Sequence, residues 1–245
     1  MTGRYKIAER CIEVRSIYGA VHGLCRDYKC DGVPVLTVRT APGDIDYERK
    51  CSAAEDIAVG RPVREFPDSY LETLAVYRKM ADGLLEYDTL LFHGSCIAVD
   101  GVAYLFTAKS GTGKSTHTAL WREYFGERAV MVNDDKPLIR VTEQGATVYG
   151  TPWRGKHELG ENISAPLSAI CVLERAENNS IRPVTAREIY PMLLQQTHRP
   201  ADPAKMVKTL TLIDRLGAAV GLYRLGCNMQ IQAAKVAYEG MVNDK

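Results

Sequence analysis

The sequence lacks a long hydrophobic run and any block of like charge. No apolar segment approaches the length that crosses a bilayer, and residues 1–10 contain no apolar signal-peptide core. The 31 basic and 30 acidic side chains give a formal net charge of +1, which argues against nucleic-acid or membrane partners that bind through a basic surface. We therefore expect a cytoplasmic protein with neither kind of partner.

Cysteine is present but shows no metal-binding or disulfide pattern. The seven cysteines are odd in number, and no two of them form a C-x-x-C pair. This favours small buried thiols in a reducing compartment over a disulfide framework or a zinc site. The apolar fraction of 46% and the charged fraction of 25% are typical of a globular protein, and 245 residues suffice for one large domain or two small ones.

The segment from Val102 to Trp121 carries the main functional signal, since an apolar strand runs into a glycine-rich turn and then a helix start. Glycines permit positive φ and let backbone N–H groups approach an anion, and the helix dipole adds a favourable field. In this reading Lys114 reaches the β- and γ-phosphates, and the Ser115 hydroxyl contacts Mg²⁺. The residues expected to bind the nucleotide are Ser110, Gly111, Thr112, Gly113, Lys114, Ser115 and Thr116.

This loop departs from the Walker A pattern G-x-x-x-x-G-K-[ST] at one position, because Ala108 stands in place of the first glycine. An alanine there needs only ordinary φ, so the positions that carry the chemistry are intact. A chance glycine turn is the alternative. The strand before the loop and the helix after it favour nucleotide binding.

The loop strand has an antiparallel neighbour in the sequence. Residues 96–99 and 102–106 form two apolar runs joined by Asp100-Gly101, which predicts a tight hairpin. A sheet built only from βαβ units would lack this hairpin, so we expect a mixed sheet. Further strands are predicted at 129–132, 138–141, 146–149, 167–174 and 220–225, and helices at 69–86, 116–124, 186–196, 205–216 and 229–241.

The amino-terminal part reads as a small α/β region without a catalytic constellation. We expect strands within residues 5–17 and 33–38, a break in the chain at 41–44, and a Ser69-x-x-Glu72 capping box at the start of the following helix. His22 is expected to be partly buried and not a ligand. The predicted domains are residues 1–88, packed on the core, and residues 89–245.

Two carboxylates follow a predicted buried strand directly. Asn133-Asp134-Asp135 comes after residues 129–132, and a strand–loop–helix–strand unit would place the aspartates beside the phosphate loop. There they can hold Mg²⁺ or accept a proton from an attacking hydroxyl. The alternative is a surface turn.

The segment from Thr151 to Glu158 also has the composition of a site loop. Arg154 or Lys156 could neutralise charge on a transferring phosphoryl group, and Glu158 or Glu161 could support the metal. A solvated charged loop is the alternative reading.

Taken in order, these motifs resemble those of a known family. His93-Gly94 before the hairpin, the loop at 110–115, Asn133-Asp134-Asp135 and Arg154-Gly155 resemble the catalytic domain of HPr kinase/phosphorylase and, more distantly, the nucleotide-binding domain of phosphoenolpyruvate carboxykinase. The likeness covers roughly residues 92–174. It implies an α/β (α+β) fold, in which a P-loop kinase domain with a mixed sheet carries a small N-terminal α/β region.

The resemblance also implies roles for individual residues. It gives His93 and Asp134 as acid/base candidates, and Lys114 as a clamp on phosphate. It gives Asp135 and Ser115 as magnesium contacts and Arg154 as a cation that stabilises the transition state. For His93, a structural role at the entry of the strand is the alternative.

The resulting hypothesis is an ATP- and Mg²⁺-dependent kinase that phosphorylates a Ser or Thr hydroxyl of a small protein or peptide. Two alternatives remain open: a kinase for a small-molecule alcohol such as a free amino acid, and a non-catalytic ATP-binding accessory protein. The sequence names neither the acceptor nor the preferred nucleotide, and it leaves a phosphorylase activity and a homo-oligomer open.

Overall fold

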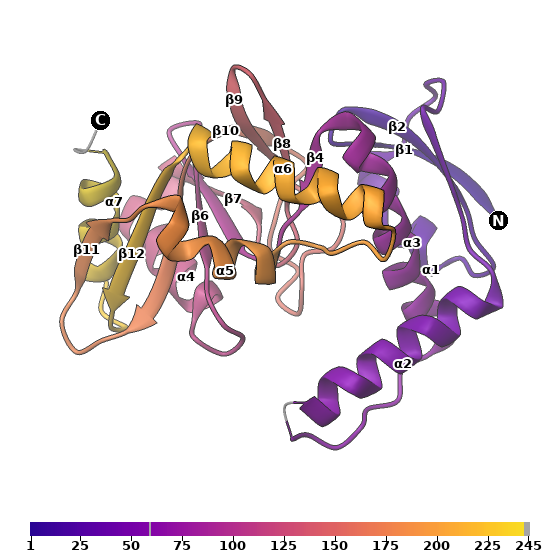
Figure 1. The fold of residues 1–245 in the computed structure, drawn as a ribbon, viewed down its shortest axis with the longest axis horizontal. Helices are drawn as coiled ribbons and strands as arrows, with labels where there is room; N and C mark the ends of the chain where they lie inside the picture. Colours follow the sequence, from indigo (N-terminus) through magenta and orange to yellow (C-terminus); the bar gives the residue numbers. More distant parts are fainter. Residues whose placement is uncertain (59, 243–245) are drawn as a thin grey trace. The chain divides into compact units, whose positions relative to one another are not determined.

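The computed structural model describes residues 1–58 and 60–242. Contacts divide the chain into two compact units, Met1–Leu84 and Leu85–Lys245. Figure 1 colours the chain by residue number, from indigo at the N-terminus to yellow at the C-terminus. The fold is mixed α/β, with a small three-stranded sheet in the first unit and a larger mixed sheet in the second. Within the described residues, no helix is both long enough and apolar enough to cross a membrane.

The sheet of the first unit begins with a two-residue hairpin. Strand β1 (Thr2–Ile7) pairs antiparallel with β2 (Arg10–Arg15), and β2 pairs parallel with β3 (Leu36–Arg39). Ala8 and Glu9 connect β1 to β2 with φ of 45° and 60°, the left-handed conformation that a tight hairpin requires. The strands predicted within residues 5–17 are confirmed, whereas the predicted strand at 33–38 starts later, at Leu36.

A long helix of the first unit was missed by the sequence analysis. The helices are α1 (Ala20–Leu24), α2 (Pro42–Ala58) and α3 (Asp68–Leu84), with a 3-10 turn at Arg26–Tyr28. The predicted break at 41–44 is wrong because Pro42 occupies the first helical position, where its missing N–H costs nothing. The Asp44 carboxylate accepts a hydrogen bond from the Ala41 N–H (2.9 Å), which satisfies a donor at the helix start.

The capping box predicted at Ser69 is also wrong. Helix α3 begins one residue earlier, at Asp68, and the Glu72 side chain does not turn back to the helix start. Its two carboxylate oxygens accept hydrogen bonds from the N–H groups of Ile17 (2.7 Å) and Tyr18 (2.8 Å). Glu72 therefore binds a loop distant in sequence instead of capping its own helix.

The second unit is built on a nine-stranded sheet among the described residues, with the order β4-β8-β9-β10-β6-β5-β7, where β12 branches from β10 and pairs with β11. The strands are β4 (Thr89–Leu91), β5 (Ser95–Val99), β6 (Val102–Thr107), β7 (Ala129–Asn133), β8 (Leu138–Thr142), β9 (Gly145–Tyr149), β10 (Ser164–Arg175), β11 (Ser180–Pro183) and β12 (Gly221–Cys227). The helices are α4 (Lys114–Phe125), α5 (Ala186–Gln196), α6 (Pro203–Ala219) and α7 (Gln232–Val242), with 3-10 turns at Leu85–Tyr87 and Gly126–Arg128.

Strand directions bring four carboxyl ends to one edge of this sheet. The predicted hairpin is confirmed, because β5 and β6 are antiparallel and Asp100 and Gly101 both have positive φ, 50° and 80°. Strand β7 is antiparallel to β5, and β10 is parallel to β6 and β12. Strands β6, β7, β10 and β12 therefore run in the same direction, and ligands of such sheets bind at the carboxyl ends of the strands.

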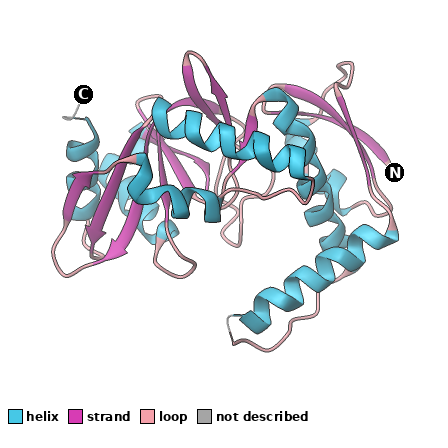
Figure 2. Cartoon of the chain, viewed as in Figure 1, coloured by secondary structure: helices cyan, strands magenta, loops and turns pink. Residues whose placement is uncertain are grey.

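Helices cover both faces of the sheet, as Figures 1 and 2 show. On one face Leu105 and Ile170 share a buried cluster with Leu193 of α5 and with residues of α6. On the other face Phe106 packs with Trp121 of α4 and residues of α7. Neighbouring residues of β6 thus point to opposite cores, which explains its uninterrupted apolar sequence.

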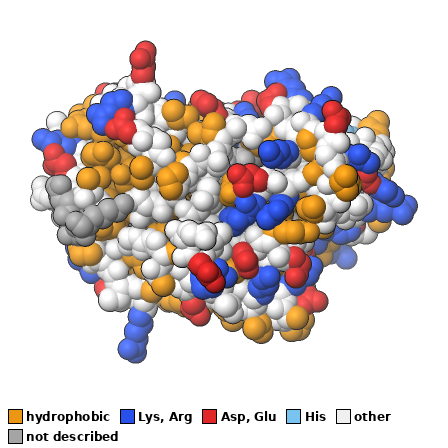
Figure 3. Space-filling view, turned by 90° about the horizontal axis from the view of Figure 1, so that it is seen from above, with side chains coloured by type: hydrophobic (Ala, Val, Ile, Leu, Met, Phe, Trp, Pro, Cys, Tyr) orange, Lys and Arg blue, Asp and Glu red, His pale blue; other side chains and the backbone are white. Residues whose placement is uncertain are grey.

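The surface carries charges of both signs. On the face drawn in Figure 3, basic and acidic side chains of the described residues are interspersed, in keeping with the balanced composition of the chain.

Candidate functional site

The loop between β6 and α4 has the backbone conformation that its glycines predict. Gly111 has φ of 79° and Gly113 has φ of 119°, values that residues with a Cβ rarely adopt. Gly113 is the N-cap of α4, and no side chain of the described residues caps it. The first N–H groups of a helix have no intrahelical partner, so this helix start offers donors and a positive dipole end to an anion.

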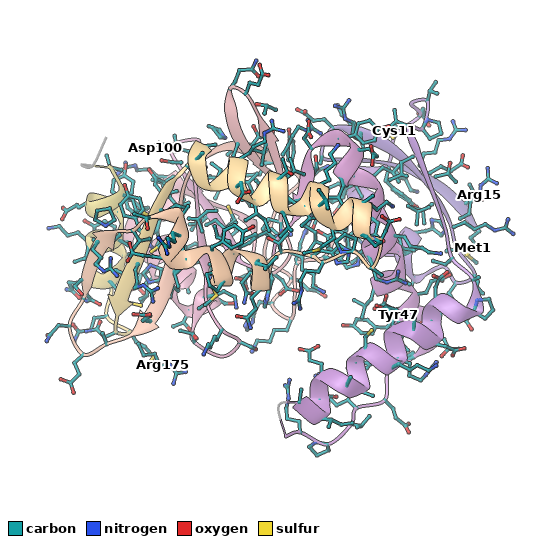
Figure 4. The ribbon with its side chains drawn as sticks, in the orientation of Figure 1. Met1, Cys11, Arg15, Tyr47, Asp100 and Arg175 are labelled. Carbon is teal, nitrogen blue, oxygen red and sulfur yellow. The ribbon has the colours of Figure 1, made fainter. Side chains whose placement is uncertain are left out.

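An arginine from a distant strand holds this loop. The Arg175 guanidinium, at the end of β10 (Figure 4), donates to the carbonyl oxygens of Gly111 (Nη2 to O, 2.6 Å) and Thr112 (Nε to O, 3.4 Å). Within the loop, the Thr112 N–H donates to the Lys109 carbonyl oxygen at 3.3 Å. These bonds fix the directions of the carbonyl groups and therefore of the peptide N–H groups that alternate with them.

Two aspartates lie on the β7 side of the loop. Asp134 is buried, and its Oδ1 accepts a hydrogen bond from the Ser95 hydroxyl at 2.6 Å. The Ser95 Oγ also lies 2.8 Å from Thr118 Oγ1 of α4. Asp135 is more accessible, and its Oδ1 lies 3.4 Å from Nε2 of His93.

Buried Asn133 shapes the turn that presents these carboxylates. Its Oδ1 accepts hydrogen bonds from the N–H groups of Asp135 (2.9 Å) and Lys136 (2.7 Å). Its Nδ2 donates to Thr151 Oγ1 (3.0 Å) and to the Trp153 carbonyl oxygen (3.3 Å). The side chain of Asn133 thus ties the aspartate turn to the segment that contains Arg154.

The charges of the site influence one another. Burial lowers the pKa of the Lys114 ammonium, and the charges of Asp135 and Asp134 act in the opposite direction without restoring it. Burial raises the pKa of Asp135, but the hydrogen bond from His93 and the charges of Lys136, His93 and Lys114 outweigh it, and the pKa lies below its usual value. Asp135 is therefore an ionised carboxylate at neutral pH.

Arg154 lies beside Asp135. A Cβ added at Gly155, which has φ of 71°, would lie 2.8 Å from the Asp135 Cβ, so the Arg154-Gly155 backbone directly contacts the aspartate turn. The Arg154 Nε is buried and has no hydrogen-bond partner among the described residues. A guanidinium with an unused donor on the segment that contacts the Asp135 turn is suited to a phosphoryl oxygen.

The other candidate residues that follow Arg154 are exposed to solvent. Lys156, His157 and Glu158 are exposed, and Glu161 is exposed and interacts with Met131 and Val132 through its backbone N–H. Among the described residues no group of three or more His, Cys, Asp or Glu side chains is arranged to hold a metal ion. Magnesium contacts by Ser115 and Asp135, with support from Glu158 or Glu161, stay predictions.

A cavity of about 820 Å³ lies on the other side of the loop. It is lined by loop residues Lys109–Thr112, by residues 172–175 at the end of β10, by α5 and by Arg224. The cavity therefore lies on the β10 flank of the loop, whereas Asp134 and Asp135 follow β7 on the other flank.

Comparison with known proteins gives a weak likeness in structure and none in sequence. No family model matches the chain, and no curated protein matches it. The chain is similar in structure to the Hpr(Ser) kinase/phosphatase from Coxiella burnetii, with a TM-score of 0.37 and 10% identity, over 63% of this chain and 97% of that chain. A likeness at this level says nothing about substrate or activity.

The structure brings several of the predicted site residues together and adds others. Lys114, Asp134, Asp135, His93 and Arg154 are linked by the contacts and charge interactions described above. Ser110 and Thr116 are exposed, and Ser110 lines the cavity together with Gly111 and Thr112. The sequence analysis missed Ser95, Thr118 and Arg175. Their contacts with the site depend on the strand order, and no local sequence motif predicts them.

Proposed function

We propose that the protein is an ATP- and Mg²⁺-dependent kinase that transfers the γ-phosphate to a Ser or Thr hydroxyl of a small protein or peptide. The observation that supports this most is the position of the positive-φ loop and Lys114 next to two aspartates at the carboxyl edge of one sheet. Phosphoryl transfer needs positioning and charge neutralisation more than covalent chemistry, and this arrangement offers both.

In this proposal the site residues have different roles in nucleotide binding and phosphoryl transfer. The N–H groups around Gly111 and Gly113 and the Lys114 ammonium bind the polyphosphate. The oxygen of the acceptor hydroxyl forms a bond to the γ-phosphorus, and Asp134 accepts the proton of this hydroxyl. The bond between the γ-phosphorus and the oxygen that bridges it to the β-phosphate breaks, which releases ADP. Arg154 compensates the charge on the transferring group.

Oxygen donors near the loop suit magnesium. Ser115 lies in the first turn of α4, and Asp135 is ionised because its pKa is lowered. A hydroxyl and a carboxylate match the ligands that Mg²⁺ prefers. Bound Mg²⁺ would neutralise charge on the β- and γ-phosphates. His93, next to Asp135, orients this carboxylate.

Two substitutions test the proposal separately at the binding and transfer steps. We expect Lys114→Ala to weaken ATP binding by about 100-fold in calorimetry, since it removes the cation of the loop. We expect Asp134→Asn to keep ATP binding and lower phosphoryl transfer from labelled ATP by about 10²–10⁴-fold, the usual contribution of a general base. The acceptors to be tried are a Ser/Thr peptide library and a panel of free amino acids.

Controls and outcomes separate the three functions. Lys235→Ala on α7 and Asp100→Asn in the hairpin turn change exposed side chains of the same types and should leave both steps intact. Full transfer by Asp134→Asn would contradict the role of this residue as the base. Phosphorylation of a free amino acid alone identifies a small-molecule kinase, and tight ATP binding without transfer to any acceptor identifies an accessory protein.

A further inference from the structure

The cavity beside the phosphate loop is not used by the transfer chemistry. The loop follows β6, which has β5 and then β7 on one flank and β10 with β12 on the other. The aspartates lie on the β7 flank, and the cavity lies on the β10 flank. We infer that this cavity holds the base and ribose of the nucleotide, an inference that rests on the proposed function.

The direction of a bound polyphosphate supports this assignment. In the proposed function the terminal phosphoryl group meets Lys114 and Asp134, and Asp134 directly follows β7. We therefore expect the chain of phosphates to run along the loop away from β7. The opposite end then leaves the loop near Gly111 and Thr112, which line the cavity themselves. A nucleoside attached to that end enters the cavity without crossing the sheet.

The size and the walls of the cavity fit an aromatic base. Its volume of about 820 Å³ lies within the range of roughly 300–1,000 Å³ for small-molecule sites. Val172 and Leu173 of β10 and Ile189, Pro191 and Met192 of α5 provide apolar walls. A methionine thioether is a favourable neighbour for an aromatic ring, and Gln195 at the rim adds an amide donor and acceptor.

The charges around the cavity are largely paired with protein groups. Glu174 forms an ion pair with Arg224, and Arg175 donates to the loop carbonyls. The Glu188 carboxylate accepts hydrogen bonds from the Thr185 N–H at 3.0 Å and from Arg182 at 3.1 Å. The buried Arg224 Nε is an exception, because it has no hydrogen-bond partner among the described residues. Apolar walls with mostly paired charges favour an uncharged nucleoside over an acidic or basic acceptor peptide.

Calorimetry with two probes, Mg-ATP and inorganic tripolyphosphate with Mg²⁺, tests the inference on the full chain. In the wild type we expect ATP to bind at least about tenfold more tightly than tripolyphosphate, because only ATP fills the cavity. Met192→Trp places an indole inside the cavity, and we expect it to weaken ATP binding about tenfold while tripolyphosphate binding is unchanged. Gln195→Trp places an indole at an exposed position of the cavity wall, so the variant does not disturb core packing, and we expect the same loss of ATP binding.

The matched control is Arg187→Trp, which adds the same side chain at an exposed position of α5 that does not line the cavity. Equal affinities of ATP and tripolyphosphate in the wild type would overturn the inference, and so would equal losses of affinity for both probes in the two cavity variants. Neither result would contradict the proposed binding of polyphosphate by the loop. Unchanged ATP binding with a raised KM for the acceptor would assign the cavity to the acceptor instead. Failure of the wild type to bind either probe would refute the proposed function itself.

Discussion

Asp134 is positioned by two hydroxyl groups from different elements. Ser95 of β5 donates its hydroxyl hydrogen to Asp134, so Thr118 is the donor in the contact with Ser95, and it shares this hydrogen with the Ser115 carbonyl oxygen at 3.2 Å. Both hydroxyls are buried, and a buried polar group is costly unless it is hydrogen-bonded. The order Thr118, Ser95, Asp134 therefore fixes one carboxylate oxygen and leaves the other for chemistry.

This order predicts graded effects at the residue scale. Ser95→Ala removes the direct donor, and we expect kcat for phosphoryl transfer to fall about tenfold, which corresponds to roughly 1.4 kcal/mol, close to the lower end of the range for one hydrogen bond to a charged group. Thr118→Val removes only the outer donor and should lower kcat about threefold. The KM for ATP should not change, because neither hydroxyl belongs to the loop.

Steady-state kinetics of both variants at saturating ATP provide the measurement, with Ser164→Ala at an exposed position of β10 as the control. An effect of Thr118→Val that equals or exceeds that of Ser95→Ala would contradict the proposed order. So would a rise in the KM for ATP at constant kcat.

The same contacts show which site residues a sequence reveals. Gly111, Gly113 and Lys114 are neighbours in a motif whose backbone chemistry is local, and Asp134 follows a strand that the apolar pattern predicts. Arg175 reaches the Gly111 carbonyl across a sequence separation of 64 residues. Its role depends on the parallel pairing of β10 with β6, which no local pattern specifies.

At the scale of elements, helix α3 was predicted from its apolar face, but the function of its first turn was misread. A Ser-x-x-Glu pattern satisfies helix N–H groups only if the glutamate has no better partners. Here the loop at 17–18 and Thr40 supply donors, and the Thr40 hydroxyl lies 2.5 Å from the Glu72 carboxylate. Helix α2 was missed because proline and glycine near 41–44 suggested a turn, although Pro42 starts the helix.

Glu72 should therefore matter for the stability of the first unit. In Glu72→Gln an amide NH₂ replaces one acceptor oxygen, and at least one partly buried donor, the N–H of Ile17 or Tyr18 or the Thr40 hydroxyl, loses its partner. We expect the free energy of unfolding of this unit to fall by about 1–3 kcal/mol. Urea unfolding followed by hydrogen exchange of the amides of β2 and α3 measures it.

The exposed Glu65 offers a control of the same type, and Glu65→Gln should change this free energy by less than about 0.5 kcal/mol. Equal stability of Glu72→Gln and Glu65→Gln would show that the interaction of Glu72 with the loop at 17–18 contributes nothing net.

At the scale of the whole molecule, the sequence predicted a mixed sheet but not its strand order. The β5–β6 hairpin is local and was predicted from Asp100-Gly101. Strand β10 is central because it pairs with β9, β6 and β12, which are far apart in the sequence. Such long-range pairing depends on which apolar faces the helices cover, and β12 was predicted as a strand without a partner.

Both tryptophans of the chain, Trp121 and Trp153, are buried in the unit Leu85–Lys245. Tryptophan fluorescence therefore follows the unfolding of the unit that contains the loop between β6 and α4. A ligand that binds only the folded state at 100 times its Kd adds about 2.7 kcal/mol of stability. For a unit of this size we expect Mg-ATP to raise the fluorescence midpoint by about 5–10 °C.

Lys114→Ala should abolish this shift, because the variant lacks the cation that we propose binds the polyphosphate. Glu72→Gln should preserve the shift, since Glu72 lies in the other unit. Inorganic tripolyphosphate with Mg²⁺ at the same concentration should give a smaller shift than Mg-ATP, because it leaves the cavity beside the loop empty. A shift of full size in Lys114→Ala would place the nucleotide elsewhere on the molecule. The thermal midpoint thus tests, in one measurement on the intact chain, whether a ligand bound by the loop stabilises the unit that carries it.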